Sequence, residues 1–345
     1  MDIISQILLI LPVLVVILTF AAYSVYAERK IAAALQQRVG PNRVGPLGLL
    51  QPAADVLKLL LKEDIIPSES NRRIHFVAPV IAVTISLVTL AVIPFGNLGD
   101  GSFLVIADIN VGVLYILAIT SISVYGVTLA GWGANSKYSL LGGLRASAQM
   151  VSYELALGLS VVSIILLTNA DADISGDFLK LTSIVEAQRD VWNIFCNPLG
   201  AVIFIICTFA EANRAPFDLV EAEQELVGGF HTEYSSMKFA MFFVAEYLHV
   251  VVGSAIISTM LFGGYLGPFE SVFGVETWAV WAKALWGVGW FLAKTIFFIC
   301  VFIWVRWTLP RFKYNQLMDM GWKRLLPLAL LNLILVAIGI AVVTA

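Results

Sequence analysis

The chain has 345 residues, of which 59% are hydrophobic and only 13% are charged, and its mean hydropathy is +0.89. An average soluble domain is roughly 45–50% apolar and about 25% charged, so this composition argues against a soluble enzyme and a disordered chain. The 21 basic and 24 acidic residues give a net charge of −3, which provides no cationic surface for nucleic acid. The three cysteines show no CxxC spacing, so we expect the chain to bind no metal, iron–sulfur cluster or other cofactor.

Eight apolar stretches are long enough to cross a bilayer, because about 20 helical residues span ~30 Å of hydrocarbon. The sequence therefore predicts an all-α polytopic membrane protein that forms a single domain over residues 1–345. The predicted spans cover residues 7–26, 76–95, 111–130, 150–168, 194–210, 239–262, 284–305 and 325–343.

The distribution of Lys and Arg predicts the direction of insertion. Most basic residues fall in the loops that follow the odd-numbered spans, at about residues 27–74, 131–149, 211–238 and 306–324. The opposite side carries only Lys180, Arg189 and Lys283 in its loops. The positive-inside rule then makes the odd loops cytoplasmic and both termini exoplasmic.

The first loop is long and contains an amphipathic segment. Gly-Pro steps within residues 40–48 force turns, and residues 49–63 then show helical periodicity. Asp55, Lys58 and Lys62 share one face, so we expect a helix that lies in the membrane interface. Such a helix is either a simple surface anchor or the floor of an access path for an amphipathic ligand.

The third of these loops, residues 211–238, is acidic on the side where basic residues are expected. If residues 218–225 are helical, Asp218, Glu221 and Glu225 share a face, and the pKa of at least one carboxyl should rise. Such groups can exchange protons near neutral pH, although most charge runs are solvated faces. The acids of the loop are Glu211, Asp218, Glu221, Glu223, Glu225 and Glu233.

Two acids lie inside predicted spans, Glu154 in the fourth and Glu246 in the sixth. A carboxylate at the centre of a membrane helix costs about 2.5–3.5 kcal/mol on insertion scales. Acids at such depth either belong to proton or ion paths or are structural acids bonded to a neighbouring helix. Residue patterns alone assign no role to His249 or Lys294.

The loop sequences resemble those of the H-type membrane subunits of the bacterial proton-translocating NADH–quinone oxidoreductase (respiratory complex I), whose mitochondrial counterpart is subunit 1. The first matching signature comprises residues 28–30 (Glu-Arg-Lys), 37–42 (Gln-Arg-Val-Gly-Pro-Asn) and 48–55. The second comprises residues 211–219 (Glu-Ala-Asn-Arg-Ala-Pro-Phe-Asp-Leu) and continues through 221–234. The resemblance spans the chain, and these long, unusual runs make it specific.

The resemblance implies a subunit that forms part of the quinone-binding chamber and couples quinone reduction to proton translocation. Family positions near the chamber match Arg29, Arg38, Asp55, Arg214 and Phe217. Family positions on an acidic proton path match Glu154, Glu211, Glu221, Glu223, Glu225 and Glu246, and the shared acidic face adds Asp218. No residue of this chain is expected to be catalytic by itself.

The resemblance also implies partners and a location. Quinone is the substrate, while FMN and the iron–sulfur clusters belong to partner subunits, so the chain alone is expected to be inactive. The partners are peripheral-arm subunits with the terminal cluster, small and antiporter-like membrane-arm subunits, and the lipid bilayer. The expected location is the bacterial inner membrane, with the mitochondrial inner membrane as the alternative. Two other functions stay open, a membrane subunit of a related membrane-bound hydrogenase and a proton-coupled transporter.

Overall fold

The computed structural model describes residues 3–99, 102–170, 177–220, 223–268, 270 and 275–344. Within these residues the chain is almost entirely helical, with seven helical segments long and apolar enough to cross a membrane. The expectation of an all-α polytopic membrane protein is therefore confirmed. The long helices are α1 (Ile3–Leu35), α3 (Arg72–Thr89), α4 (Gly112–Gly133), α5 (Lys137–Ala170), α10 (Ser236–Leu261), α12 (Val280–Thr308) and α14 (Leu326–Thr344).

The fifth predicted span is shorter than expected. It forms α8 (Pro198–Glu211), whose 14 residues correspond to about 21 Å. The helix begins at Pro198 because proline suits the first helical position and the Asn197 side chain accepts a hydrogen bond from the Gly200 amide. A separate short helix, α7 (Asn193–Cys196), precedes it.

Two long helices extend beyond the predicted spans. α5 begins at Lys137, so most of the predicted loop 131–149 is helical. α14 continues from α13 (Tyr314–Asp319) through a π-helical turn, Met320–Leu325. The remaining short elements are α2 (Gln51–Leu61), α6 (Leu181–Glu186), α9 (Glu223–Leu226), the 3₁₀ turns Pro46–Gly48, Leu90–Val92, Gly229–His231 and Val275–Thr277, and an antiparallel pair of strands, β1 (Gly96–Asn97) and β2 (Phe103–Leu104).

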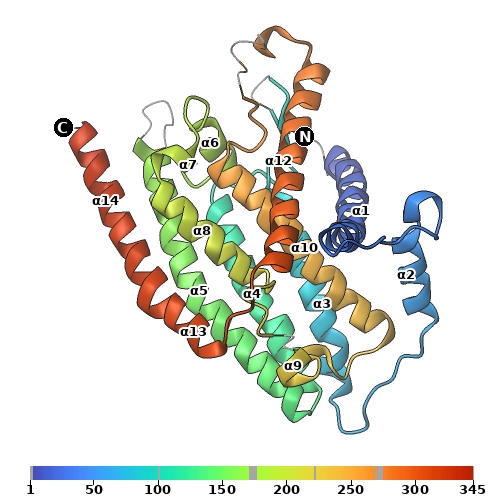
Figure 1. Ribbon diagram of the computed structural model, residues 1–345. Helices are drawn as coiled ribbons and strands as arrows, with labels where there is room; N and C mark the ends of the chain where they lie inside the picture. The colour runs from blue at the N-terminus through green and yellow to red at the C-terminus, as the bar shows by residue number, and fades with distance from the viewer. Residues whose placement is uncertain are drawn as a thin grey trace.

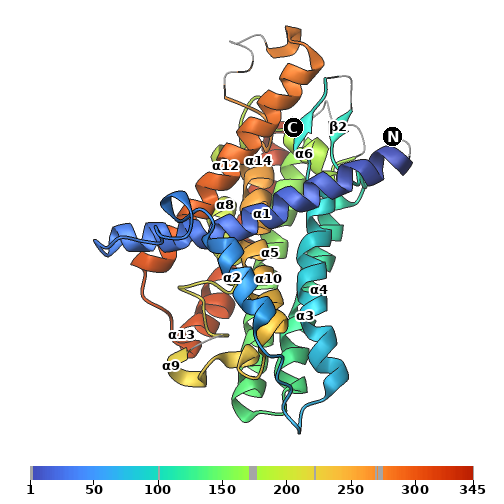
Figure 2. The ribbon, with the colours of Figure 1, turned by 90° about the vertical axis from the view of Figure 1, so that its right-hand side faces the viewer.

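The long helices pack side by side around α5 and α10. α4 lies between α3 and α5, while α8 and α14 pack against α5, and α10 contacts α3, α12 and α1. Figure 1 shows α14 at one edge of the molecule, and Figure 2 shows α1 crossing α10 obliquely. α1 begins and α14 ends near the same end of the bundle in both views, as expected for an even number of passages.

The amphipathic segment forms α2, which lies outside the bundle (Figures 1 and 2) and has no buried residue. Hydrogen bonds hold it and the following residues to the start of α10. Ser236 Oγ donates to the Leu59 carbonyl at 3.1 Å, and Ser235 Oγ accepts from the Ile65 amide at 2.8 Å. α2 therefore contacts the beginning of α10, and it also contacts α1.

Candidate functional site

A cluster of buried charges joins α1, α10, α12 and the loop after α8. Glu28, 6% exposed, interacts with Arg214 Nη1 at 3.2 Å and Arg306 Nη1 at 2.6 Å. The Tyr247 hydroxyl donates to the same carboxylate at 2.7 Å. Arg214, 3% exposed, forms a second ion pair through Nε with Glu246 at 2.7 Å. The buried charge cluster thus joins four elements that are distant in the sequence.

The composition of this cluster explains how it tolerates burial. Two carboxylates face two guanidinium groups, so the charges balance, and removal of one partner would leave an uncompensated buried charge. Burial alone lowers the pKa of Arg214, but the carboxylates of Glu246 and Glu28 outweigh it and raise that pKa. The guanidinium also lies 4.1 Å from the centre of the Tyr247 ring, a cation–π contact.

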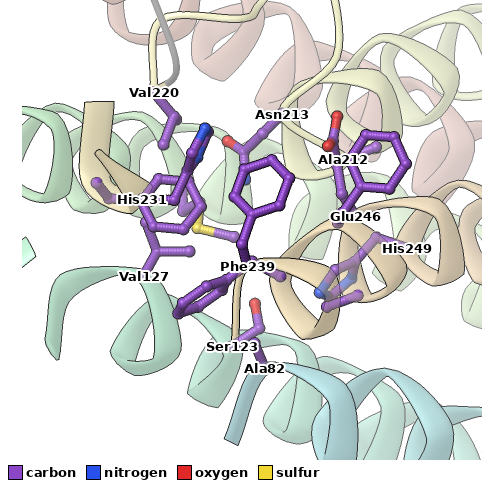
Figure 3. A pocket seen from close by; sticks show the side chains of 15 residues that line it. Ala82, Ser123, Val127, Ala212, Asn213, Val220, His231, Phe239, Glu246 and His249 are labelled. Carbon is purple, nitrogen blue, oxygen red and sulfur yellow. The ribbon is translucent and has the colours of Figure 1, made fainter. Parts of the chain in front are cut away.

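A cavity of about 60 Å³ lies beside Glu246 in the interior of the helix bundle. Figure 3 shows Glu246 and His249 from α10, Ser123 from α4, and Asn213 and His231 around this cavity. One water molecule needs about 10–15 Å³ of such volume and two or more polar partners, and the cavity meets both conditions.

The other two acids of the membrane region share a second, smaller cavity of about 20 Å³. Glu154 from α5 hydrogen-bonds with Ser121, and Glu211 at the end of α8 hydrogen-bonds with Thr120. Both hydroxyl groups come from α4. Met150 lines this cavity and also the one beside Glu246. The structure therefore brings the intramembrane acids together in two neighbouring compartments.

The residues predicted near a quinone chamber occupy different environments. Arg29 and Asp55 form an ion pair at 2.6 Å that joins α1 to α2, and they are 43% and 27% exposed. Arg38 is exposed and donates to Gln36 at 2.7 Å. Of the predicted cations, only Arg214 lies in the buried cluster. The exposed groups lie at the surface, where a partner protein would have access to them.

Phe217 lies in an aromatic group next to the buried cluster. Its ring centre is 5.5 Å from that of Tyr153 on α5 and 5.6 Å from that of Phe312, which precedes α13. Phe217 is only 4% exposed, so its present contacts pack the loop against the bundle. Its place near a chamber stays a prediction from the resemblance.

The conditional expectation of one helix over residues 218–225 is wrong. Asp218 lies in a turn region, and the short helix α9 begins only at Glu223. Glu221 and the side chain of Glu223 lie outside the described residues. Because α9 is only a single turn, Asp218 and Glu225 do not share a helical face.

Of the three carboxyl groups for which at least one raised pKa was expected, Glu225 has a lowered pKa. A hydrogen bond from Arg145 lowers the pKa of Glu225, and Arg311 contributes in the same direction. The Arg145 Nη1 to Glu225 Oε2 distance is 2.6 Å. Arg145 on α5 and Arg311 after α12 thus compensate part of the acidic loop, a long-range pairing that local charge counting cannot detect.

Residue patterns alone missed three members of the cluster. Glu28 belongs to the first loop signature but received no role, and Tyr247 and Arg306 were not singled out. Glu28 and Arg306 lie at the same predicted membrane side, each at the end of a span, where charged residues are so common that their position alone does not single them out. His231 was also left without a role; burial lowers its pKa to about 4, so the ring is neutral at pH 7.

No group of three or more His, Cys, Asp or Glu side chains that could hold a metal ion occurs in the described ranges.

Comparisons with known proteins agree with the loop signatures. A family model described as NADH dehydrogenase matches residues 8–337. NADH-quinone oxidoreductase subunit 8 of Rhodothermus marinus is 59% identical over 329 residues, covering 93% of both chains. The H-type subunit of the oxidoreductase of Salinibacter ruber is 55% identical and covers 93% of this chain and 91% of its own length. A further H-type subunit, from Cytophaga hutchinsonii, is 47% identical and covers 95% and 94%.

The match extends over nearly the whole chain, and the helical bundle has the spans that a membrane subunit requires. The chain belongs to the NADH dehydrogenase family, whose members include the H-type membrane subunits of NADH–quinone oxidoreductase.

Proposed function

We propose that this subunit forms the membrane-side wall of a quinone chamber and transmits the charge changes of quinone reduction to protonatable groups in the membrane. The observation that carries the proposal is the buried cluster of Glu28, Arg214 and Glu246. It connects the end of α1, next to α2, with a carboxylate that borders an internal cavity.

The place where α1, α2 and α10 meet suits an amphipathic substrate. A quinone has a long apolar tail and a planar headgroup with two carbonyl acceptors, so its site needs an apolar approach and a few polar donors. α2 presents an exposed apolar surface that includes Val56, Leu57 and Leu60. The Arg29–Asp55 pair and the Glu28 cluster provide polar groups along the last turns of α1.

The cluster also supports a mechanism of coupling. Reduction of a quinone takes up two electrons and two protons, so the chamber gains negative charge until protons from outside replace those that its own groups have given to the quinone. In a buried network the attraction between charges is stronger than in water, and a change near Glu28 alters the energy of Arg214 and hence of Glu246. Glu246 would then gain or release a proton, followed by Glu154 and Glu211. Asp218, Glu221, Glu223 and Glu225 would provide the loop end of this path.

We further infer that the subunit acts only within the assembled oxidoreductase. FMN and the iron–sulfur clusters would be held by peripheral-arm subunits that dock on the exposed loops, and antiporter-like subunits would continue the membrane arm. The excess of basic residues in the odd loops supports insertion in a bacterial inner membrane with both termini periplasmic. The names of the relatives support this function over a hydrogenase subunit or a transporter.

The test is Glu246→Gln in the assembled complex, reconstituted into vesicles. The amide keeps the shape of the side chain but cannot carry the proton or the charge, so proton translocation should fall by at least about tenfold. Quinone reductase activity and proton translocation should be measured together. Asp319→Asn is the control, because Asp319 is exposed and pairs with Lys323 one turn away. Unchanged translocation in Glu246→Gln would overturn the proposed coupling.

A further inference from the structure

A groove separates part of α1 from the helices behind it. It has a volume of about 250 Å³, and its lining residues come mainly from the first halves of α1 and α12 and the second half of α10, with Phe95 and Leu104 beside the strand pair. On α1 it extends from Pro12 to Phe20, which lies about 12 Å before Glu28 of the buried charge cluster. Because α1 crosses α10 obliquely (Figure 2), the two helices cannot stay in contact over their whole length.

The lining of this groove is suited to an aliphatic chain. Thr295 is the one lining residue with a polar side chain, and its hydroxyl donates to the Phe291 carbonyl at 2.8 Å. The lining residues therefore offer no free hydrogen-bonding side chain to water or to a quinone headgroup with its two carbonyl acceptors. An aliphatic chain needs no such partner, and it gains dispersion contacts with the walls.

The groove opens toward the surface that faces lipid. Val16 lines the groove and is 49% exposed, and its neighbour Val15, which does not line it, is 58% exposed. On α12, Trp281 lies two turns before Val288 on the same face and is 70% exposed. Tryptophan is typical of the interface where lipid headgroups lie. The groove thus runs from the level of Trp281 into the hydrocarbon region, where an unfilled space would leave its walls without contacts.

The same part of α1 has few other attachments. Among the described residues, the side-chain hydrogen bonds of Thr19 and Ser24 stay within α1, and no hydrogen bond or ion pair joins residues 10–25 to another helix. The ion pairs of Glu28 fix only the last turns of α1. Apolar contacts alone therefore hold the beginning of this helix, and a chain in the groove would add to them.

We propose that the groove binds one acyl chain of a phospholipid from the leaflet at the outer end of the bundle, where α1 begins and α10 ends. The chain fills the space between α1, α10 and α12, and it thereby fixes the first half of α1 to the bundle. The headgroup lies at the level of Trp281. This site is independent of the coupling role proposed above, so either proposal can fail while the other stands.

The first experiment counts the phospholipids that the detergent-purified, assembled complex retains, by native mass spectrometry. Val16→Trp and Val288→Trp each fill the groove from one wall with an indole ring. Val15→Trp is the matched control, because Val15 is exposed on the same helix outside the groove. We expect each filling variant to lose one retained phospholipid and Val15→Trp to keep the wild-type number. The wild-type number in both filling variants would overturn the site.

The second experiment identifies the occupant in the wild-type complex, so its result does not depend on the assembly of any variant. Vesicles contain the complex and a phosphatidylethanolamine with a photoactivatable group in the middle of one acyl chain. Parallel vesicles contain a quinone with the same group on its isoprenoid tail. After purification in detergent and irradiation, the labelled peptides are sequenced. We expect the phospholipid probe to label α1 within residues 12–20 and α12 within residues 288–295.

Labelling of these segments by the quinone probe alone would assign the groove to a quinone tail. Labelling by neither probe would mean that side chains of a partner subunit close the groove. Either result would overturn the proposal.

The third experiment tests whether the chain fixes α1. Phospholipid is added back to delipidated complex, and the thermal inactivation midpoint is measured before and after. The midpoint should rise in the wild type and in Val15→Trp and rise less in Val16→Trp, whose groove is already filled. Equal increases in all three proteins would show that the bound chain does not stabilise α1.

Discussion

A cation lies in each of two regions of the helix bundle, the inner end around the loop after α8 and the outer end around the turn after α10, and the two cations are stabilised in different ways. At the inner end, Arg214 contacts the carboxylates of Glu28 and Glu246. At the outer end, half-buried Lys294 on α12 donates to three backbone carbonyl groups in the turn that follows α10, with its Nζ 4.9 Å from the Trp192 ring centre. The carbonyl groups belong to Phe262 at 2.6 Å, Gly264 at 3.0 Å and Leu266 at 2.6 Å.

The chemical nature of the acceptor groups determines how each site can respond to a change of charge or pH. Backbone carbonyl groups accept hydrogen bonds without changing their own charge, so the hydrogen bonds of Lys294 fix α12 to the turn that follows α10. Carboxylates change their charge when they bind a proton, so the Arg214 site can respond to a redox event nearby. We therefore expect changes at the outer end to affect stability alone and changes at the inner end to affect both stability and coupling.

The largest effect is expected from Arg214→Met. This variant leaves Glu28 and Glu246 as buried carboxylates with fewer partners, and loss of one partner of a buried ion pair costs about 3–5 kcal/mol. The amount of assembled complex and its thermal inactivation midpoint should both fall, and proton translocation should fall with them. Arg214→Lys, which keeps the charge but not the guanidinium geometry, should lie between. Wild-type stability in Arg214→Met would contradict the ionic cluster as a structural centre.

The second effect concerns pH and His231, close to the inner cavity. Its folded-state pKa is about 4, below the ordinary value of 6.5, so the unfolded chain binds the proton more strongly. The stabilisation by neutral His231 is complete above about pH 6.5 and is lost as the pH falls toward 4, with a total on the order of 3 kcal/mol. Thermal inactivation between pH 7 and pH 4 should therefore show a smaller loss in His231→Asn than in the wild type. Identical pH profiles would exclude His231 as a contributor.

Lys294→Met is the corresponding change at the outer end. It removes the donor for three carbonyl groups, and each buried acceptor left without a partner costs about 1–3 kcal/mol unless water replaces the donor. The thermal midpoint should fall, while the ratio of protons translocated to NADH oxidised in the surviving complex should stay at the wild-type value. A lower ratio would show that the outer end also takes part in coupling.

The smallest effect is expected at the surface of the inner end. Glu225 is 47% exposed and pairs with Arg145, and exposed pairs contribute less than about 1 kcal/mol. Its pKa is lowered, so this stabilisation is present above the ordinary carboxyl pKa of about 4.3 and is lost as the pH falls through the lower folded value. The difference in stability between the wild type and Glu225→Gln should be small at pH 7 and absent in strong acid. A large difference at pH 7 would mean that Glu225 is buried in the complex by a partner.

The sequence predicted those features that depend on local periodicity and composition. Long apolar stretches predicted the spans, and the amphipathic pattern predicted α2. The sequence did not predict the short α8, because hydropathy does not register where Asn197 and Pro198 begin a helix. It also misjudged residues 218–225, since helical periodicity in a short charged segment gives no information about the turns on either side.

The sequence predicted some residues of the candidate site and missed others, for the same reason. Glu154 and Glu246 were found because a carboxylate inside an apolar span is conspicuous in any sequence. Glu28 and Arg306 were missed because each lies at the end of a span, where charged residues are common and carry no signal. Their role depends on the pairing of each with residues roughly two hundred or more positions away.

The sequence by itself determined that this is a helical membrane protein, which loops hold its charged motifs and which family it resembles. These features follow from the hydrophobic effect and from helix geometry, which act on residues near one another in the chain. Only the tertiary structure decided which charges neutralise each other and which acids share a cavity. Such contacts join distant helices, and the energy of a buried charge depends on the few groups within hydrogen-bonding distance of it.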